Sequence, residues 1–204
     1  MTYVKASVRR PAGNPGNGIQ PKDQLVIYDV DDILSFPQRN DAGVVIEDDI
    51  VMKAGRYAIG IYLTPGTAEI SSNSDGETDA EGYTPSVKFN HPGNEQEIRE
   101  FKTNWLSKKC IVVLRYCSGK PADLIGTPCN PCKLSVSYTG SNESNTNELT
   151  FTQISKGDDI AIYRGTDTLE EPVAVVEAGA TDIDYQTDGQ YQLSAGAAKI
   201  AGVT

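Results

Sequence analysis

The chain has 204 residues, a net charge of −10 and 38% hydrophobic residues, and its mean hydropathy is −0.38. Its longest apolar runs, such as residues 111–114 (IVVL), are only as long as a strand, which argues against a membrane-spanning helix of about 18 residues. An acidic surface repels phosphate groups, which argues against a sequence-reading nucleic-acid-binding protein.

Residues 1–23 contain three prolines and three glycines, which disfavour regular structure and predict an extended arm. The first ten residues, MTYVKASVRR, lack the apolar stretch of a secretory signal, so none is expected. The arm is expected either to be free or to dock on a neighbouring subunit.

The next part of the chain predicts strands at residues 24–30, 43–52 and 57–63, where apolar residues cluster or alternate with polar ones. Within 43–52, three consecutive acidic residues suggest a bulge or turn. Residues 71–82 (SSNSDGETDAEG) have the polar, acidic composition of a mobile loop. The loop does not match an EF-hand, because Gly82 stands where the bidentate glutamate belongs.

One short amphipathic helix is predicted at about residues 94–107. Ile98, Phe101 and Trp105 recur at helical spacing, which predicts an apolar stripe that packs on a sheet.

The sequence around this helix specifies its ends. Asn94 is the expected N-cap, with Glu97 as its capping-box partner. A strand containing residues 87–89 precedes the helix, and a strongly apolar strand follows at 109–116.

The remaining sequence predicts more short strands separated by polar turns. These are expected at residues 133–139, 149–154, 159–163, 172–177 and once within 190–204, with a hairpin loop at 140–148. The predicted fold class is therefore mainly β: a β-sandwich or barrel with one short amphipathic helix, an extended N-terminal arm and long loops. The length fits a single β-rich domain over 24–204, in which residues 170–204 are either integral or a peripheral extension.

The four cysteines are Cys110, Cys117, Cys129 and Cys132. Without an export signal, reduced thiols are the default. Only Cys129 and Cys132 have the spacing of a zinc knuckle, and a zinc site usually needs a second such pair or histidines. We expect free thiols and no cofactor, with zinc at Cys129 and Cys132 as the less favoured alternative.

The sequence contains no recognisable catalytic pattern. His91 is the only histidine, and no nucleophile motif accompanies it. Carboxylate doublets such as Asp158-Asp159 do not make a glycosidase dyad by themselves, because adjacent residues of a strand face opposite sides. We expect the protein not to be an enzyme.

The order of an arm, a β-sandwich, a strand–helix–strand insertion and a long polar hairpin resembles the major tail tube proteins of phages, which share a tube fold with contractile injection systems. The resemblance is carried by GYTPSVKFNHPGNEQEIREFKTNWLSKKCIVVLRYC and NELTFTQISKGDDIAIY. It covers about residues 80–165 and has the character of phages of Bacteroides-type hosts. Residues 117–132 and the C-terminal part depart from the family's pattern.

This resemblance implies hexameric rings that stack into a tube within the virion, assembled in the host cytoplasm. The implied partners are further copies of the chain and other tail or head-completion proteins, with DNA passing without specific binding and no membrane insertion. An acidic lumen would release DNA, because it offers no cations to replace the counterions of the phosphates. The expected channel-facing residues are Glu47, Asp48, Asp49, Asp158 and Asp159.

Two other interpretations stay open. The first is a different virion structural protein, such as a tail-completion ring, a head–tail connector or a capsid decoration. The second is a ligand- or carbohydrate-binding β-sandwich, for which Tyr57, Tyr62, Tyr83 and Tyr116 are candidate contacts, although these tyrosines serve a core equally well.

Overall fold

The computed structural model describes residues 7–12, 16–18, 20–117, 119–169, 174–176 and 191–193. The fold is mainly β, as the sequence predicts, and the described residues form one α-helix. The chain divides into two compact units, residues 1–169 and 170–204. In the second unit, β13 (Ala174–Val176) pairs in parallel with β14 (Tyr191–Leu193).

The first unit contains the other elements, whose bounds are β1 (Pro21–Asp29), a short 3-10 helix η1 (Val30–Asp32), β2 (Ile33–Ser35), β3 (Val45–Ile46), β4 (Val51–Met52), β5 (Ile59–Tyr62), β6 (Glu69–Asp75), β7 (Gly82–Pro92), α1 (Gln96–Trp105), β8 (Cys110–Tyr116), β9 (Ala122–Ile125), β10 (Cys132–Gly140), β11 (Asn145–Gln153) and β12 (Ala161–Tyr163).

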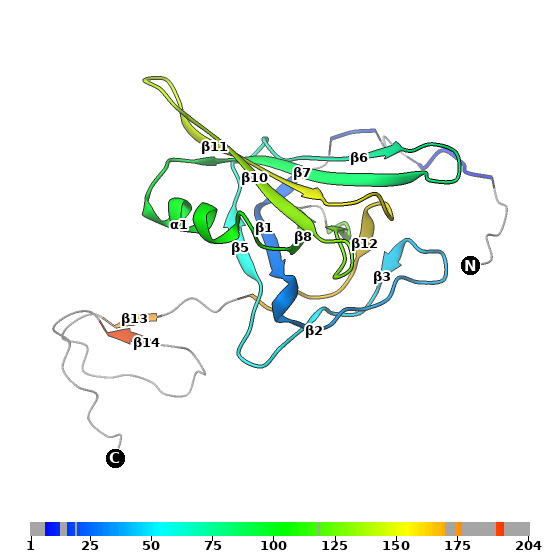
Figure 1. Cartoon of the computed structure of the whole chain (residues 1–204), viewed down its shortest axis with the longest axis horizontal. Helices are drawn as coiled ribbons and strands as arrows, with labels where there is room; N and C mark the ends of the chain where they lie inside the picture. The colour runs from blue at the N-terminus through cyan, green and yellow to red at the C-terminus, as the bar shows by residue number, and fades with distance from the viewer. Residues whose placement is uncertain are drawn as a thin grey trace, which may run out of the picture. The chain divides into compact units, whose positions relative to one another are not determined.

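The main sheet consists of two layers that meet where β8 contacts β10. Strand β8 pairs with β1 along one edge and with β9 along the other, and it meets β10 at one position only, Cys110 opposite Cys132. One layer therefore has the order β5-β1-β8-β9-β12-β3, and the other has the order β10-β11-β7-β6. In Figure 1, β6 and β7 run across the direction of β1 and β5, as in a sandwich whose layers cross steeply.

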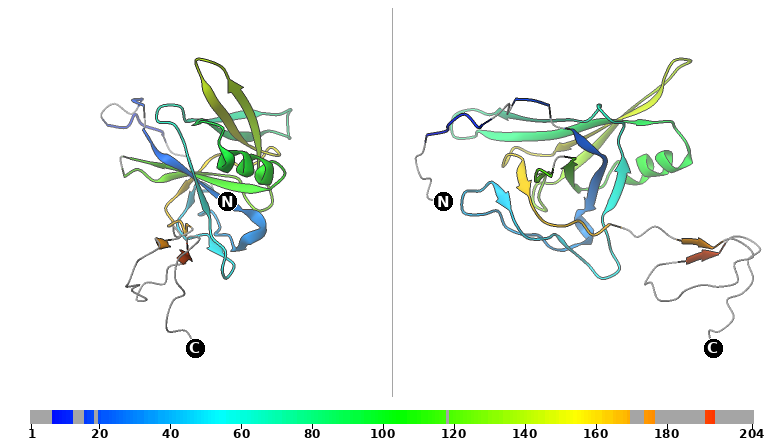
Figure 2. Two further views of the ribbon diagram at one scale, coloured as in Figure 1. Left: turned by 90° about the vertical axis from the view of Figure 1, so that its left-hand side faces the viewer. Right: turned by 180° about the vertical axis from the view of Figure 1, so that it is seen from behind.

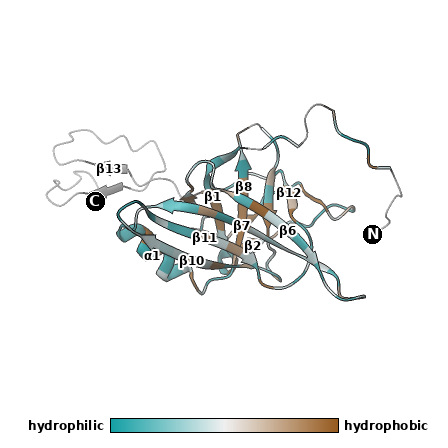
Figure 3. Ribbon diagram, turned by 90° about the horizontal axis from the view of Figure 1, so that it is seen from above, coloured by the Kyte–Doolittle hydropathy of each residue, from teal (hydrophilic) through white to brown (hydrophobic). Residues whose placement is uncertain are grey.

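The apolar residues form two cores on opposite sides of the six-stranded layer. The larger core lies between the two layers and includes Leu25, Val112 and Phe151. The smaller core, which includes Tyr28 and Tyr163, is covered by side chains from β2, β4 and their flanking segments. Strands β1 and β8 are thus buried on both faces, which explains their unbroken apolar runs, and Figure 3 shows hydrophobic residues dominating β8.

Helix α1 follows β7 and contributes its apolar stripe to the larger core. Ile98 is 4% exposed, and Phe101 and Trp105 pack at the border of the core with their rings stacked 5.8 Å apart. Figure 2 shows the helix beside the base of the β10–β11 hairpin.

The predicted capping box is wrong. The N-cap is Glu95, and its side chain makes no capping hydrogen bond. Asn94 lies one residue earlier, where its side-chain oxygen accepts a hydrogen bond from Lys102 Nζ at 2.8 Å. The side-chain oxygen of Asn94, which was expected to cap the helix, is therefore bonded to Lys102 instead.

Two further predictions are corrected by the structure. The expected mobile loop at 71–82 is strand in its first part, because β6 extends to Asp75 and pairs with β7 along its whole length, and only residues 76–81 lie outside the two strands. Strand β1 begins at Pro21, inside the segment expected as an arm, whereas the described residues before it are exposed and have no regular structure. Strands with mostly polar residues show no clear alternation of apolar and polar positions, so the end of β6 and the start of β1 could not be predicted from the sequence.

Candidate assembly surface

The four-stranded layer has one apolar face and one polar face. Its inward side chains, such as Val87, Phe89 and Phe151, are fully buried in the larger core. The alternate residues point the other way and are half-buried or exposed. They form what we call the polar face: Glu69, Ser71, Asn73, Asp75, Thr84, Ser86, Lys88, Asn90, Lys133, Ser135, Ser137, Thr139, Thr146, Glu148, Thr150 and Thr152.

The polar face is ordered in rows across the strands. One row contains, in register, Glu69, Lys88, Thr150 and Ser135. Within it Lys88 Nζ lies 3.6 Å from Glu69 Oε2, and in the adjacent row Ser71 Oγ and Ser86 Oγ share a hydrogen bond of 3.0 Å. The face carries two lysines against Glu69, Asp75 and Glu148, and Asp75 pairs with Lys156 at 3.2 Å, so the face is close to neutral, in contrast to the net charge of −10 for the chain.

Both outer strands of this layer have an open backbone edge. Strand β6 pairs with β7 alone, and β10 pairs with β11 on one side and meets β8 only at Cys132 on the other. Among the described residues, no other strand pairs with the outer edge of β6 or with β10 beyond Cys132. Exposed edges are normally shortened, charged or broken by proline. Strand β6 has no proline and carries charge only at its two ends, Glu69 and Asp75.

The β10–β11 hairpin extends beyond the rest of the first unit, and α1 supports its base (Figures 1 and 2). Lys102 of α1 makes the connection. Its Nζ donates to Asn94 Oδ1 at 2.8 Å and to Asn147 Oδ1 at 2.6 Å, and it lies 5.2 Å from the centre of the Tyr138 ring. Asn147 is fully buried and donates in turn to the Gly93 carbonyl. Loss of water around the ammonium lowers the pKa of Lys102.

The acidic residues expected to face a channel lie in the other layer, at two separate places. Strands β3 and β12 run parallel, so residues that follow β3 and residues that precede β12 lie at opposite ends of the pair. Glu47, Asp48 and Asp49 follow β3, whereas Asp158 and Asp159 precede β12. The structure therefore brings the two groups to one sheet edge without bringing them together.

Most of these carboxylates have partners within the chain. Glu47 pairs with Arg164 at 2.9 Å, and Asp49 accepts the Thr166 N–H at 2.6 Å. Asp159 accepts hydrogen bonds from Ser72 Oγ and from the N–H of the residue that follows it. These contacts fix loops, and a channel-facing role for the five residues stays a prediction.

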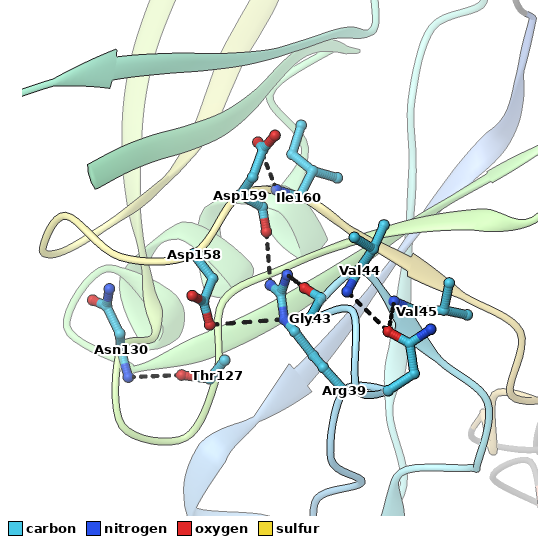
Figure 4. A network of polar contacts seen from close by, with 10 residues as sticks. Arg39, Gly43, Val44, Val45, Thr127, Asn130, Asp158, Asp159 and Ile160 are labelled. Atoms are coloured by element: carbon cyan, nitrogen blue, oxygen red, sulfur yellow. Dashed lines mark hydrogen bonds and ion pairs between the residues drawn. The ribbon is translucent and has the colours of Figure 1, made fainter. Parts of the chain in front are cut away.

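Arg39, which the sequence did not single out, organises the polar network drawn in Figure 4. Its guanidinium donates to the Gly43 carbonyl at 3.0 Å and to the Asp159 carbonyl at 2.7 Å, and its Nε lies 3.9 Å from Asp158 Oδ2. The side chain is only 14% exposed. Arg39 thus ties the loop before β3 to the segment before β12, which holds the two strands in register. Its only sequence signal is a single arginine in a polar loop.

The cysteines divide into two buried and two exposed thiols. Cys110 and Cys132 are buried, whereas Cys117 and Cys129 are exposed, and all four are free. Burial raises the pKa of the Cys110 thiol to about 12 and also raises that of Cys132. Cys129 and Cys132 thus differ in burial, and within the described ranges no group of three or more His, Cys, Asp or Glu side chains is placed to hold a metal ion.

His91 and the four candidate tyrosines differ in how far they are exposed to solvent. Burial lowers the pKa of His91, whose Nδ1 is buried without a hydrogen bond to the described residues and whose ring packs edge-on against Tyr62 at 6.2 Å. Tyr116 is buried, whereas Tyr57, Tyr62 and Tyr83 are exposed.

Comparison of the chain with protein-family models, curated proteins and solved structures gives no significant match. In the part of the chain that the structure describes, no helix combines the length and hydropathy required to cross a bilayer.

Proposed function

We propose that the chain is a structural subunit that assembles with copies of itself into closed rings, and that stacked rings form the tube of a phage tail through which DNA passes. The proposal joins the resemblance of the sequence to tail tube proteins with one structural observation. That observation is a four-stranded antiparallel layer with a polar outer face and an open edge on each side.

The strand directions of this layer suit ring closure. The order β10-β11-β7-β6 is antiparallel throughout, so the two outer strands run in opposite directions. When β6 of one copy lies beside β10 of the next, the antiparallel alternation continues across the junction. The two edges differ, so the contact is head-to-tail, which closes into a ring when the rotation between copies permits. A closed barrel leaves no strand edge unpaired.

The dimensions are compatible with a DNA channel. Strands lie about 4.8 Å apart, so four strands contribute about 19 Å of wall, and six copies give a circumference of about 115 Å and a diameter of about 37 Å between backbones. Strand tilt widens the barrel and inward side chains narrow it. The remaining bore exceeds the width of a DNA duplex.

In this arrangement the polar face lines the channel. The charges of Glu69, Lys88, Lys133 and Glu148 balance, Asp75 pairs with Lys156, and the other lining groups are hydroxyls and amides. Such a wall offers no excess of cations, so phosphates gain nothing by exchanging their counterions for it. The proposal therefore replaces an acidic wall with a neutral one as the reason why DNA passes freely.

Negative-stain electron microscopy of the purified full-length chain tests the proposal. We expect rings or tubes with a central bore. Single rings that do not lengthen would favour a tail-completion ring or connector. Dispersed monomers at high protein concentration would contradict assembly and favour a ligand-binding sandwich.

A further inference from the structure

We propose that a basic cavity beside the start of β1 binds the acidic turn between β6 and β7 of a second copy. This inference rests on the self-assembly proposed above and identifies a second contact between subunits. It pairs two surfaces of opposite charge that the chain carries in different places.

The cavity has a volume of about 430 Å³ and lies between the start of β1, the end of β8 and the segment after β12. Three of its lining residues are cations, Lys22, Arg115 and Arg164, and one lining residue, Asp167, is an anion. Glu47, which pairs with Arg164, is a second carboxylate beside the cavity, so the cations exceed the anions by one. In a chain with a net charge of −10, this local excess of positive charge stands out.

Arg115 is held in a fixed position in the cavity. It forms an ion pair with Asp167, donates to the Gly165 carbonyl at 2.7 Å and lies 5.6 Å from the centre of the Tyr163 ring. Asp167 also accepts the Tyr28 hydroxyl at 2.7 Å, so its carboxylate is well occupied. The guanidinium is therefore positioned before any ligand arrives, which lowers the entropic cost of binding.

The other two cations are accessible. Lys22 is exposed, and its side chain has no hydrogen bond or ion pair with another described residue. Arg164 pairs with Glu47 at the surface, where both side chains are 54% exposed, so the pair is weak and exchangeable. The cavity thus presents two exposed cations beside one fixed guanidinium.

The acidic turn has the complementary charge. Asp75, Glu77, Asp79 and Glu81 are all exposed, and no lysine or arginine occurs between residues 70 and 87. Only Asp75 has an ion pair within the described part of the chain, to Lys156 at 3.2 Å.

The backbone gives this turn a defined shape. Gly76 has φ +147°, and a Cβ there would lie 2.3 Å from the Ala80 carbonyl oxygen, so the close approach requires glycine. Three carboxylates are therefore presented together at the end of a hairpin.

The two surfaces of one copy do not meet. Figure 1 shows the turn at the end of the β6–β7 hairpin, well apart from the start of β1. The turn and the cavity can therefore pair only between copies. Each copy carries one acidic turn and one basic cavity, so the contact can repeat from subunit to subunit. Such complementarity also offsets the general repulsion between acidic chains.

Charge reversal in the full-length chain tests this pairing. One variant carries Glu77→Lys and Asp79→Lys, and the other carries Lys22→Glu and Arg164→Glu. Each variant alone should need about a tenfold higher concentration to assemble, and an equimolar mixture should assemble like the wild type because opposite charges meet again. Sedimentation velocity measures assembly, and circular dichroism checks the fold. The matched controls are Lys109→Glu and Glu100→Lys, which reverse exposed charges elsewhere and should assemble normally.

Salt gives a second readout. Raising NaCl from about 0.1 M to about 1 M shortens the screening length from about 10 Å to about 3 Å and should weaken the contact in the wild type but not in the variants. Normal assembly of both reversed variants would overturn the inference and leave the proposed function intact. Loss of assembly that mixing does not restore would also overturn it. A wild-type chain that never assembles would overturn the proposed function as well.

Discussion

Cys110 and Cys132 face each other at the single position where the two layers of the sheet join. They are register partners between β8 and β10, and Cys110 Sγ donates to the Cys132 carbonyl at 3.4 Å. Gly126 lies against this corner with φ +91°, and a Cβ there would lie 3.2 Å from Cys132 Sγ. The turn of the chain from one layer to the other is thus packed around two small thiols and a glycine.

The buried thiols make stability depend on pH. An unfolded thiol loses its proton above a pH of about 8.5, whereas burial raises the pKa of Cys110 to about 12 in the folded chain. Between these values the unfolded state binds fewer protons than the folded state, so the free energy of unfolding falls as pH rises, by at most about 1.4 kcal/mol per pH unit for each thiol. Denaturant unfolding under reducing conditions between about pH 8 and pH 10 should show this slope.

The slope should be smaller in Cys110→Ala and unchanged in Cys117→Ala, since Cys117 is exposed. Equal slopes in the wild type and Cys110→Ala would show that the thiol is not buried as described.

Arg39→Ala should destabilise the fold by about 2–3 kcal/mol, because it removes charge-assisted hydrogen bonds to two carbonyls. Arg39→Lys should recover only part of the loss, since an ammonium does not reproduce the planar fork of the guanidinium. Arg56→Ala is the control. Arg56 forms a surface pair with Asp32 and is 62% exposed, so its loss should change stability by no more than about 0.5 kcal/mol. Chemical denaturation measures the free energy of unfolding of all three variants. Equal effects of Arg39→Ala and Arg56→Ala would show that the Arg39 contacts do not stabilise the fold.

Proline substitution separates the open edge of β6 from its paired edge. In an antiparallel edge strand, consecutive residues direct their N–H groups alternately to the neighbouring strand and to solvent. Of Asn73→Pro and Ser74→Pro, one therefore loses a bond to β7 and stability, whereas the other loses only an outward donor. We expect the second to fold like the wild type but to fail to assemble in sedimentation experiments. Assembly of this folded variant at the wild-type concentration would argue against edge pairing.

Deletion of residues 1–18 tests the arm. The deletion spares β1 and Gln20, whose carbonyl accepts the Cys117 N–H at 3.0 Å. We expect an intact fold by circular dichroism and rings that do not stack into tubes by electron microscopy. Tubes of normal length from the shortened chain would refute a docking role for the arm.

Some features of the fold were predictable because one physical effect dominated them. The apolar run at 111–114 predicted a strand, which the structure shows to be buried on both faces. The stripe of Ile98, Phe101 and Trp105 predicted the helix that packs against the larger core. The long hairpin loop was also indicated by its polar composition, although the strands extend further into it, to Gly140 and from Asn145.

Other features depend on contacts that a linear pattern does not record. Strand β6 reads as a loop because its polar residues are stabilised by pairing with β7 rather than by burial. The two-residue pairing of β3 with β12 is flanked by Arg39, which donates to the carbonyl of Asp159, 120 residues away in the sequence. The polar face emerges only when four strands are placed in register, so alternation in a single strand could not reveal a surface suited to assembly.

The most direct test of the central claim is cross-linking between β6 of one copy and β10 of the next. Asn73→Cys and Ser137→Cys would be combined in a chain that also carries Cys117→Ser and Cys129→Ser, and the assembled particles would be treated with a short bifunctional thiol reagent. The account predicts a ladder of covalent oligomers that requires both new cysteines and is absent when Glu100→Cys replaces Ser137→Cys. Assembled particles that yield no ladder, or yield the same ladder with the helix control, would contradict the pairing of these strands.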